Sequence, residues 1–304
     1  DPVHAIQLEP GIPGEHHVQE SDSFPPRFLW GAATSAYQIE GSPLADGAGA
    51  SIWHRFSHTP GRTLDGMTGD VACDHFHRWR DDVALMSRLG LQSYRFSVAW
   101  GRVFPEGFGR VNEKGLAFYE RLVDSLLAAN ITPMLTLFHW DLPAALADRG
   151  AWLNPDMPKW FADYAGTLFE RLGDRVPLWC TLNEPWVVVD AGYVHGVNAP
   201  GHRDWYEAAR AAHGLLLSHA AAVRRFRDMR VKRAKIGLVV NLAPHHAATD
   251  APEDVAAAAR GNAYFNEQFL DPVFFGRYPE LVLEMYGDAW PEHSPEELQS
   301  LTEP

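Results

Sequence analysis

The chain has 304 residues, 46% of them hydrophobic and 12% aromatic, which provides enough apolar side-chain mass to bury a large core. The formal net charge of −13 is spread along the chain without a basic block, so phosphate-rich partners such as nucleic acids would be repelled. No apolar run approaches the roughly 20 residues that a membrane helix needs. Composition therefore predicts a soluble globular protein with neither a nucleic acid nor a membrane as partner.

The N-terminal segment differs in character from the rest of the chain. Residues 1–23 are polar and lack the apolar core of a signal sequence. We expect them to form a flexible tail ahead of a single folded domain, residues 24–304. The pair His16-His17 in this segment reads as part of a solvated tail and not as a site.

Cysteine usage bears on the compartment and on metals. Only two cysteines occur, Cys73 and Cys180, each beside an apolar or structural run. This predicts buried thiols in a reducing compartment, with the cytoplasm as the default location. Cys73, His75 and His77 are metal-capable side chains, but one residue between ligands does not match common zinc spacings. No metal site is predicted.

Short apolar runs alternate with amphipathic helical stretches along the chain. The predicted strands are Phe28 to Ser35, Ser93 to Trp100, Pro133 to His139, Leu178 to Asn183, and Lys235 to Asn241. Between these strands, apolar residues recur at helical spacing, which predicts helices over Phe76 to Leu89, Leu116 to Leu126, and Trp160 to Leu172. Such alternation indicates parallel strands with helical crossovers, in an open doubly wound sheet or a barrel.

Polar and aromatic side chains stand at the carboxyl ends of the predicted strands. They are Tyr37, Gln38, Trp100, His139, Trp140, Asn183, Glu184 and Asn241. A barrel builds its active site at that face. A doubly wound dinucleotide-binding sheet would need a G-x-G-x-x-G turn after its first strand, and the run from Gly31 to Ala33 lacks that spacing. The pattern favours the barrel.

Glu184 is the acid most directly placed for chemistry. The apolar run from Val176 to Cys180 reads as a buried strand, and Pro185 cannot continue it with a paired amide. Glu184 is therefore expected at a strand exit. On spacing alone, an ordinary solvated loop glutamate is an equal alternative.

Several long motifs share one resemblance. The segment from Phe28 to Gly41 closely resembles the N-terminal signature of family 1 glycoside hydrolases, the β-glucosidase family. Further matches follow in the family's order: Asp70 to His75, Tyr94 to Trp100, Leu135 to Pro143, Thr181 to Pro185, Phe269 to Pro272, and Gly276 to Pro279. The resemblance runs from about Phe24 to the last residue.

The resemblance implies a (β/α)8 TIM barrel that hydrolyses terminal β-D-glucosyl residues with retention of configuration and without a cofactor. The substrate would be a β-glucoside or a short β-linked oligosaccharide. An acid must protonate the departing oxygen while a second carboxylate about 5 Å away attacks the anomeric carbon. Glu184 matches the family's acid/base, so its pKa should lie above the usual value of about 4.3. Asn183 is similar to the residue that hydrogen-bonds the sugar 2-hydroxyl.

Gln38 and His139 look like the residues that bind the 3- and 4-hydroxyls of the sugar, because an amide and an imidazole suit neighbouring hydroxyls. Arg95 resembles the arginine that pairs with the nucleophile and keeps it ionised. Each residue has a structural alternative. A histidine beside an apolar run is usually a satisfied core residue, and an arginine inside a barrel can serve a purely structural ion pair.

Trp140 is expected to pack against the sugar ring, and Trp186 to face the leaving group. Either could instead be a plain core aromatic. Asn241 is a weaker candidate on the leaving-group side. Three loop positions also depart from the family pattern: His54 stands where Asp is commoner, Gly101 where Pro or Ser is usual, and Asn198 where many members carry His.

The chain is short for eight repeats. The four repeats from Leu29 to Lys235 take about 50 residues each, so eight would need roughly 400. By pattern, the family's T-E-N-G segment with the nucleophilic Glu is missing. Late carboxylates such as Glu267, Glu296 and Glu297 lie in predicted helices and not at strand ends.

We therefore expect the N-terminal portion of a β-glucosidase, with about five of eight repeats, that needs the C-terminal part of the barrel from the same or a separate chain. One alternative is an inactive half-barrel that binds sugar or forms a homo-oligomer, because an open barrel exposes two strand edges. Another is a barrel lyase or isomerase that shares the motifs by chance. Glucose, galactose, fucose and 6-phospho sugars differ at positions read partly by the absent segment.

Overall fold

The computed structural model describes residues 24–303, and the predicted tail, residues 1–23, lies outside them. The strands are β1 Gly31–Ala33, β2 Ser93–Ser97, β3 Thr132–Phe138, β4 Leu178–Asn183 and β5 Lys235–Val239. The α-helices are α1 Ala36–Ile39, α2 Ile52–Ser57, α3 His75–Arg88, α4 Trp100–Val103, α5 Glu113–Ala128, α6 Ala144–Ala147, α7 Met157–Leu172, α8 Pro185–Val189, α9 Trp205–Asp228, α10 Pro252–Asn262, α11 Gln268–Phe275, α12 Glu280–Tyr286 and α13 Pro295–Gln299. Two π-helical turns, Asp190–Val194 and Ala263–Glu267, follow α8 and α10.

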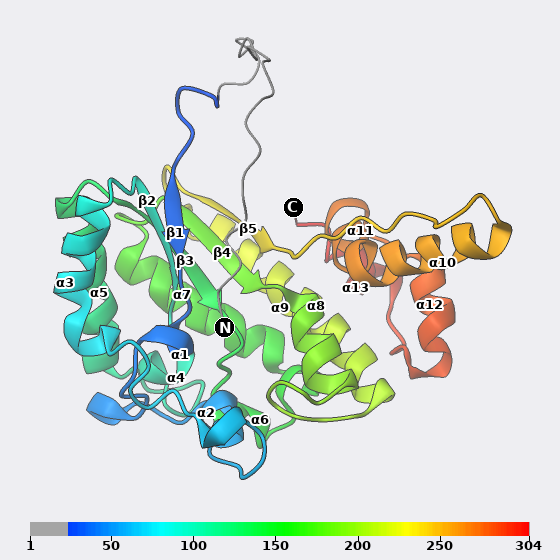
Figure 1. The fold of residues 1–304 in the computed structure, drawn as a ribbon, viewed down its shortest axis with the longest axis horizontal. Helices are drawn as coiled ribbons and strands as arrows, with labels where there is room; N and C mark the ends of the chain where they lie inside the picture. Colours follow the sequence, from blue (N-terminus) through cyan, green and yellow to red (C-terminus); the bar gives the residue numbers. More distant parts are fainter. Residues whose placement is uncertain (1–23, 304) are drawn as a thin grey trace, which may run out of the picture.

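The five strands form one parallel sheet in the order β1-β2-β3-β4-β5 (Figure 1). Each strand pairs with the next one along the chain, which is how a barrel wall is built, whereas a doubly wound sheet reverses its order at a switch point. The carboxyl ends of all five strands therefore meet at one edge. The short elements α1, α2, α4 and α6 lie at that edge, below the strands in Figure 1.

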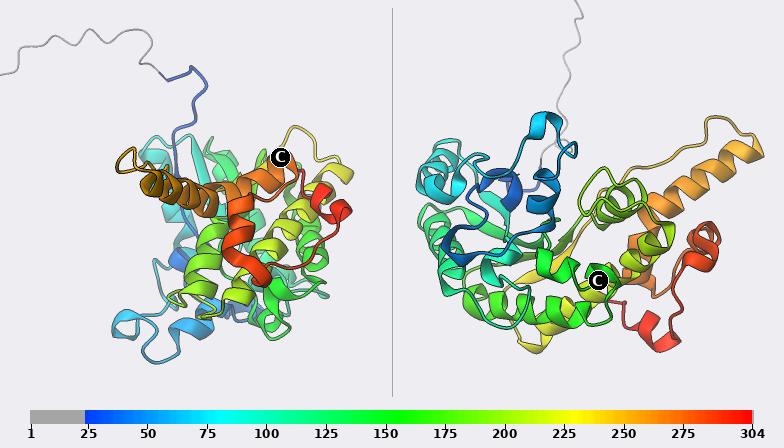
Figure 2. Two further views of the ribbon diagram at one scale, coloured as in Figure 1. Left: turned by 90° about the vertical axis from the view of Figure 1, so that its right-hand side faces the viewer. Right: turned by 90° about the horizontal axis from the view of Figure 1, so that it is seen from below.

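The long helices α3, α5, α7 and α9 cover one face of the sheet in chain order (Figures 1 and 2). In α5 the buried residues Leu116, Tyr119, Leu122 and Leu126 recur at the three- and four-residue spacing that the sequence showed. Burying each such side chain contributes about 1.5–3 kcal/mol. The three predicted helices are thus present.

Local sequence explains where the long helices begin and end. The Asp204 carboxylate accepts hydrogen bonds from the amides of Tyr206 and Glu207, at 2.8 and 2.9 Å, and so caps α9. Pro158 lies in the first turn of α7, where its missing amide hydrogen costs nothing. Gly90 follows α3 with a φ of +72°, which glycine adopts without strain.

A buried ion pair fastens the carboxyl-end loops to the helices. Arg102 Nε donates to Glu40 Oε2 at 3.0 Å, and Tyr119 Oη donates to Glu40 Oε1 at 2.7 Å. Arg102 Nη2 also donates to the Gly41 carbonyl at 3.1 Å. Both charged side chains are buried, so the pair depends on these added hydrogen bonds to offset desolvation. The pair anchors α1, the turn that carries Gln38.

Three details differ from the sequence prediction. β1 is only three residues long and exposed, and it pairs with β2. The rings of Phe28 and Trp30, which were expected within the strand, pack on each other ahead of it. Trp100 leaves the strand edge for the core, where it stacks on Tyr164 at a ring distance of 4.6 Å. The prediction of two buried thiols is wrong for one, since Cys73 is exposed and Cys180 is buried.

The sheet is open at both edges. β1 is exposed, and β5 is only half-buried, although an apolar run such as Lys235 to Asn241 is typical of a strand that is covered on both faces. After β5 the chain runs outward to α10, none of whose residues is buried, and returns through α11 and α12 against α9 (Figure 1). No helix within residues 24–303 is long and apolar enough to cross a membrane.

Candidate functional site

Two of the predicted site residues meet across the sheet. Arg95 on β2 donates from Nη2 to Oδ1 of Asn183 on β4, at 3.0 Å, bridging over β3. Asn183 is buried and Arg95 is half-buried. Each side chain therefore restrains the other at the carboxyl edge.

An irregularity in β4 directs Asn183 inward. The pairing of β4 with β5 shifts register between Cys180 and Asn183. Thr181 bonds His219 of the covering helix α9, at 2.7 Å, and simple alternation would put Asn183 on that same face. The bulge re-aims Asn183 toward Arg95 on the other face, which is a common use of bulges beside active sites.

Glu184 ends β4 in an uncommon backbone conformation. Its φ of 48° is left-handed, although it is not glycine and precedes Pro185, which ordinarily forces an extended residue before it. The Glu184 amide donates to the Val239 carbonyl at 2.8 Å, so the sheet holds this conformation. Strain of this kind costs about 1–3 kcal/mol and concentrates at functional sites. The half-buried side chain is thus fixed at the strand exit.

β3 ends in the same manner one strand away. Trp140 also has a positive φ, 78°, and its Nε1 donates to the Asn183 carbonyl at 2.9 Å. The neighbouring His139 has a buried Nδ1 without a hydrogen-bond partner in the described part of the chain. Burial, followed by the charge of Arg95, lowers the pKa of His139 to about 4. A neutral imidazole with a free nitrogen can donate to or accept from a hydroxyl.

A cavity of about 290 Å3 brings Gln38, His139 and Trp140 together. Its wall consists of Ser35, Tyr37, Gln38, Trp53, Ser57, Thr63, Met67, Thr68, Gly69, Ala72, His139 and Trp140. The size suits a small ligand, and an amide, an imidazole and an aromatic face suit one that carries hydroxyls. Glu184 does not line this cavity; it follows Asn183, whose carbonyl accepts from Trp140.

Trp186 and Asn241 stand apart from this group. Trp186 packs against Phe265 at a ring distance of 4.1 Å and edge-on against Tyr264. This contact supports its alternative interpretation as a packing residue. Asn241 is half-buried two residues beyond β5, and no hydrogen bond within residues 24–303 joins it to Asn183.

The cavity contains residues that the sequence interpretation missed. Trp53 and Ser57 come from α2, and Met67 and Thr68 from the loop before α3, so most of the wall lies between the first two strands. A signal was present, since Ser51 is a good helix N-cap residue ahead of the apolar Ile52, Trp53 and Phe56. Asp141 was also overlooked; it is fully buried beside the Glu40 network.

Metal-capable side chains gather in one place in the described part of the chain: His54, His58 and Asp70. Cys73, His75 and His77, which are close together in the sequence, do not form such a group. His75 is buried and bonds Asp82 at 2.6 Å, whereas the exposed His77 bonds Asp74 at 2.6 Å.

A parallel sheet in sequential order, with hydrogen-bonding and aromatic groups gathered at its carboxyl edge, defines the class of (β/α)8-barrel proteins with a small-molecule site at that edge. The model of glycosyl hydrolase family 1 matches residues 20–304. The chain belongs to glycosyl hydrolase family 1, which confirms the family expected from the motifs.

Known relatives agree with this assignment. The chain is 53% identical over 281 residues to beta-glucosidase A of Thermotoga maritima, covering 92% of this chain and 63% of that protein. It is 50% identical over 279 residues to a 1,4-beta-D-glucan glucohydrolase of Thermotoga neapolitana, covering 91% and 65%. The solved family 1 b-glucosidase from Thermotoga maritima matches with a TM-score of 0.90 at 52% identity, over 92% of this chain and 63% of that one. The barrel fold is thereby confirmed, and the chain spans 63% of that relative's length.

Proposed function

We propose that the chain forms the acid/base side of the active site of a retaining β-glucosidase, which hydrolyses terminal β-D-glucosyl residues from β-glucosides or short β-linked oligosaccharides. The observation that carries the proposal is the position of Glu184. It sits at the bulged carboxyl end of β4, in a conformation that the sheet enforces, directly after an Asn183 fixed by Arg95. Relatives of the chain in Thermotoga maritima and Acetivibrio thermocellus are named beta-glucosidase A.

In this proposal Glu184 protonates the departing glycosidic oxygen and later takes a proton from water. Asn183 hydrogen-bonds the sugar 2-hydroxyl, a contact that strengthens as positive charge develops on the ring. Arg95 holds Asn183 through Nη2, while its buried Nε has no protein partner in residues 24–303 and stays available for a carboxylate. That carboxylate would be the nucleophile.

The sugar-binding part of the proposal rests on the shared cavity. Gln38 and His139 would bind adjacent hydroxyls, and Trp140 would offer its indole face to the ring. His139 suits this role because its low pKa keeps the imidazole neutral above pH 5. On the leaving-group side, Trp186 and Asn241 are the proposed contacts, with Trp186 braced by Phe265.

We further infer that the nucleophilic carboxylate comes from outside this chain. The late acids considered from sequence lie in helices: Glu267 closes a π-helical turn, and Glu296 and Glu297 are in the first turn of α13. The open edges of β1 and β5 fit a barrel completed by further strands. The cytoplasmic location drawn from cysteine usage stays a prediction.

A second candidate is a sugar-binding half-barrel that self-associates without hydrolysis. The observation that favours it is the apolar cluster beside the β1 edge, where Phe24, Phe28 and Trp30 are exposed with ring distances of 4.6–4.7 Å. Such edges invite pairing with another copy. Measuring the mass in solution beside hydrolysis of a chromogenic β-glucoside separates the two candidates.

The experiment that tests the first proposal replaces Glu184 by Gln in the protein whose barrel is complete. With a methyl β-glucoside, whose methanol is a poor leaving group, the rate of hydrolysis is expected to fall by about 10²–10⁴-fold, because the amide cannot transfer a proton to the departing oxygen. With a dinitrophenol leaving group, which departs without protonation, bond cleavage is expected to be nearly unaffected. Glu284→Gln, an exposed control on α12, should change neither rate. An equal loss of rate on both substrates would contradict the assignment of Glu184 as the proton donor.

A further inference from the structure

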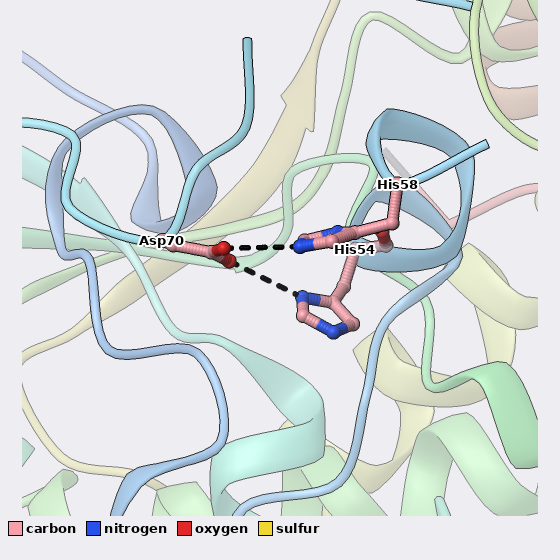
Figure 3. A group of neighbouring side chains, drawn as sticks. All are labelled: His54, His58 and Asp70. Atoms are coloured by element: carbon pink, nitrogen blue, oxygen red, sulfur yellow. Dashed lines mark hydrogen bonds and ion pairs between the residues drawn. The ribbon is translucent and has the colours of Figure 1, made fainter. Parts of the chain in front are cut away.

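Two histidines and one aspartate converge beside residues of the cavity wall: His54 and His58 neighbour Trp53 and Ser57 in the chain, and Asp70 follows Gly69 (Figure 3). His58 Nε2 lies 3.0 Å from Asp70 Oδ2, and His54 Nδ1 lies 3.6 Å from Asp70 Oδ1. One candidate ligand atom from each residue falls within 4.8 Å of the others. We call these three residues the histidine–aspartate cluster.

His54 lies in α2 and His58 is the residue directly after it, so the helical backbone places both imidazoles on the same side of the helix. His54 and His58 are four residues apart, which puts them on the same face, and their rings are 4.2 Å apart. Ser51 caps the helix by accepting from the His54 amide at 3.1 Å. The histidine positions are thus set by backbone structure and not by each other.

Hydrogen bonding orients the His58 ring toward Asp70. Its Nδ1 lies 2.7 Å from the His54 carbonyl, which can only accept, so Nδ1 carries a hydrogen. Nε2 is then the nitrogen that faces the carboxylate. A backbone carbonyl on one ring nitrogen, with the other nitrogen aimed at a shared point, is the usual support of a metal-binding histidine.

Of the three side chains, His54 is the one whose Nδ1 has no hydrogen-bond partner within residues 24–303. Its Nδ1 is buried, and 3.6 Å from Asp70 is too long for a hydrogen bond. A metal ion in front of this nitrogen would satisfy it, because an imidazole binds a metal through its unprotonated nitrogen.

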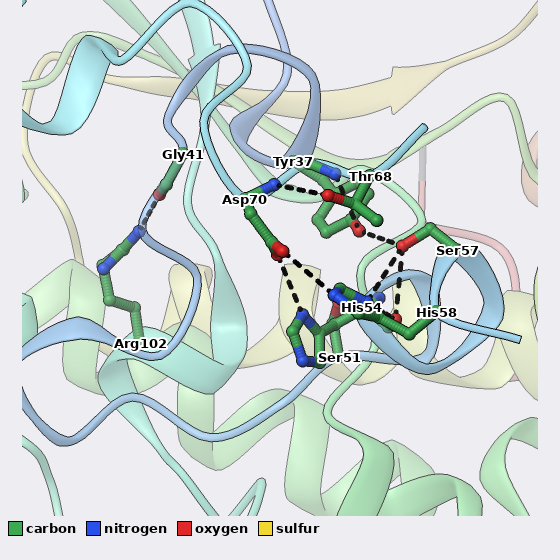
Figure 4. Close-up of polar contacts among 10 residues, drawn as sticks. Tyr37, Gly41, Ser51, His54, Ser57, His58, Thr68, Asp70 and Arg102 are labelled. Atoms are coloured by element: carbon green, nitrogen blue, oxygen red, sulfur yellow. Dashed lines mark hydrogen bonds and ion pairs between the residues drawn. The ribbon is translucent and has the colours of Figure 1, made fainter. Parts of the chain in front are cut away.

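The loop that carries Asp70 is already tied to α2 (Figure 4). The Gly69 amide donates to Tyr37 Oη at 3.3 Å, and that hydroxyl is 2.7 Å from Ser57 Oγ on α2. The Asp70 carbonyl accepts from the Ser42 amide at 2.7 Å. The three ligand groups are therefore positioned before any ion arrives.

The spacing fits a particular class of ion. A tetrahedral zinc with nitrogen and oxygen ligands at about 2.0–2.2 Å separates its ligand atoms by about 3.3–3.6 Å. Of the two observed separations, His54 Nδ1 to Asp70 Oδ1 at 3.6 Å is at the upper end of that range, and His58 Nε2 to Asp70 Oδ2 at 3.0 Å is a little shorter. Two imidazoles favour zinc, cobalt, nickel or copper over magnesium and calcium, which prefer oxygen.

We propose that His54 Nδ1, His58 Nε2 and the Asp70 carboxylate bind a divalent transition-metal ion of the zinc type, with water in the remaining position. The site is separate from Glu184 and does not depend on the proposed hydrolysis. Its effect would be mechanical. The ion links α2 to the loop at Gly69, and both segments form the cavity wall around Gln38.

Co2+ and Zn2+ are the probes for the test at pH 7.5. The background protein carries His4, His16 and His17 as Ala, so that imidazoles in residues 1–23 do not bind the probe. One equivalent of Co2+ is expected to give visible absorption bands between about 500 and 650 nm, as low-coordinate cobalt does. His54→Ala, His58→Ala and Asp70→Asn are each expected to weaken the binding about tenfold or more.

His202→Ala is the matched control, because His202 pairs with the surface carboxylate of Glu207 at 2.5 Å but belongs to no group of three metal-capable side chains within residues 24–303. It should leave the affinity unchanged. In parallel, Zn2+ should raise the Tm of the background protein and not that of His58→Ala. The absence of cobalt bands, an unchanged affinity in His58→Ala, or an equal loss in His202→Ala would overturn the proposal.

Discussion

Raising the pH from 6.5 to 8 is expected to destabilise the fold through Asp141. This aspartate is 3% exposed, lies next to the Glu40 and Arg102 pair, and has a buried Oδ1 without a hydrogen-bond partner in residues 24–303. Burial, followed by the charge of Glu40, raises its pKa from an ordinary 3.8 to about 8. The native protein therefore keeps a proton that the unfolded chain releases.

The sign follows from proton linkage. Between pH 4 and pH 8 the native state binds more protons at Asp141 than the unfolded state, so the free energy of unfolding falls as pH rises. Each full unit in that window costs up to about 1.4 kcal/mol. Because the native proton is already partly lost near pH 8, the expected fall from pH 6.5 to 8 is about 1.5 kcal/mol.

The window above pH 6.5 also reduces a competing effect. Burial lowers the pKa of His139 and of His219 to about 4 each, so the fold loses stability as pH falls through 6.5, when the unfolded chain takes up protons at these histidines. Above pH 6.5 each of them still adds up to about 0.4 kcal/mol of stability, as the unfolded histidine loses its remaining proton. The contribution of Asp141 is therefore measured as the difference between the protein and Asp141→Asn, in which both histidines are retained.

Urea unfolding of the protein at pH 6.5, 7 and 8 measures the effect. Asp141→Asn, whose amide imitates the protonated acid, is expected to lack the fall of about 1.5 kcal/mol. Asp81→Asn on the exposed side of α3 is the control and should keep it. Identical pH profiles for the protein and Asp141→Asn would refute the reasoning.

Two other changes probe the same region. Glu40→Gln leaves the buried Arg102 guanidinium without its charge partner and is expected to cost about 3–5 kcal/mol in urea unfolding; a loss below 1 kcal/mol would show that the pair is not desolvated. In the protein with a complete barrel, His139→Gln is expected to weaken the binding of deoxynojirimycin about tenfold by calorimetry, because the free imidazole nitrogen is lost; this compound is the ligand in a solved beta-glucosidase of Thermotoga maritima. The contribution of His139 to affinity should be constant from pH 7 to 5, and a loss of that contribution near pH 6.5 would contradict its low pKa.

The strands could be predicted because their signals are local. β4 shows this most clearly, since an apolar run followed by Glu184 and Pro185 gave its bounds without reference to any other segment. The carboxyl ends of parallel strands necessarily share an edge, so Asn183 and His139 could be expected near one another. The bulge that turns Asn183 toward Arg95 could not, because it arises from pairing with β5, more than 50 residues later.

The cavity wall and the buried charges were harder to predict. Trp53 and Met67 line the cavity because α2 and the following loop fold back over α1, an arrangement without sequence periodicity. Cys73 was expected to be buried, yet the left-handed turn at Ala72 carries it to the surface. Asp141 carries no sequence signal of burial, because its pocket is shared with Glu40 and Arg102 from distant segments of the chain.

Azide rescue tests the assignment of Glu184 most directly. In the protein with a complete barrel, Glu184→Ala should form its glycosyl intermediate from a dinitrophenyl β-glucoside but release it slowly, because no base activates water. Azide needs no base, so we predict a faster turnover with azide and β-glucosyl azide as the product, identified by NMR. No acceleration by azide, or α-glucosyl azide as the product, would contradict Glu184 as the general acid/base of a retaining enzyme.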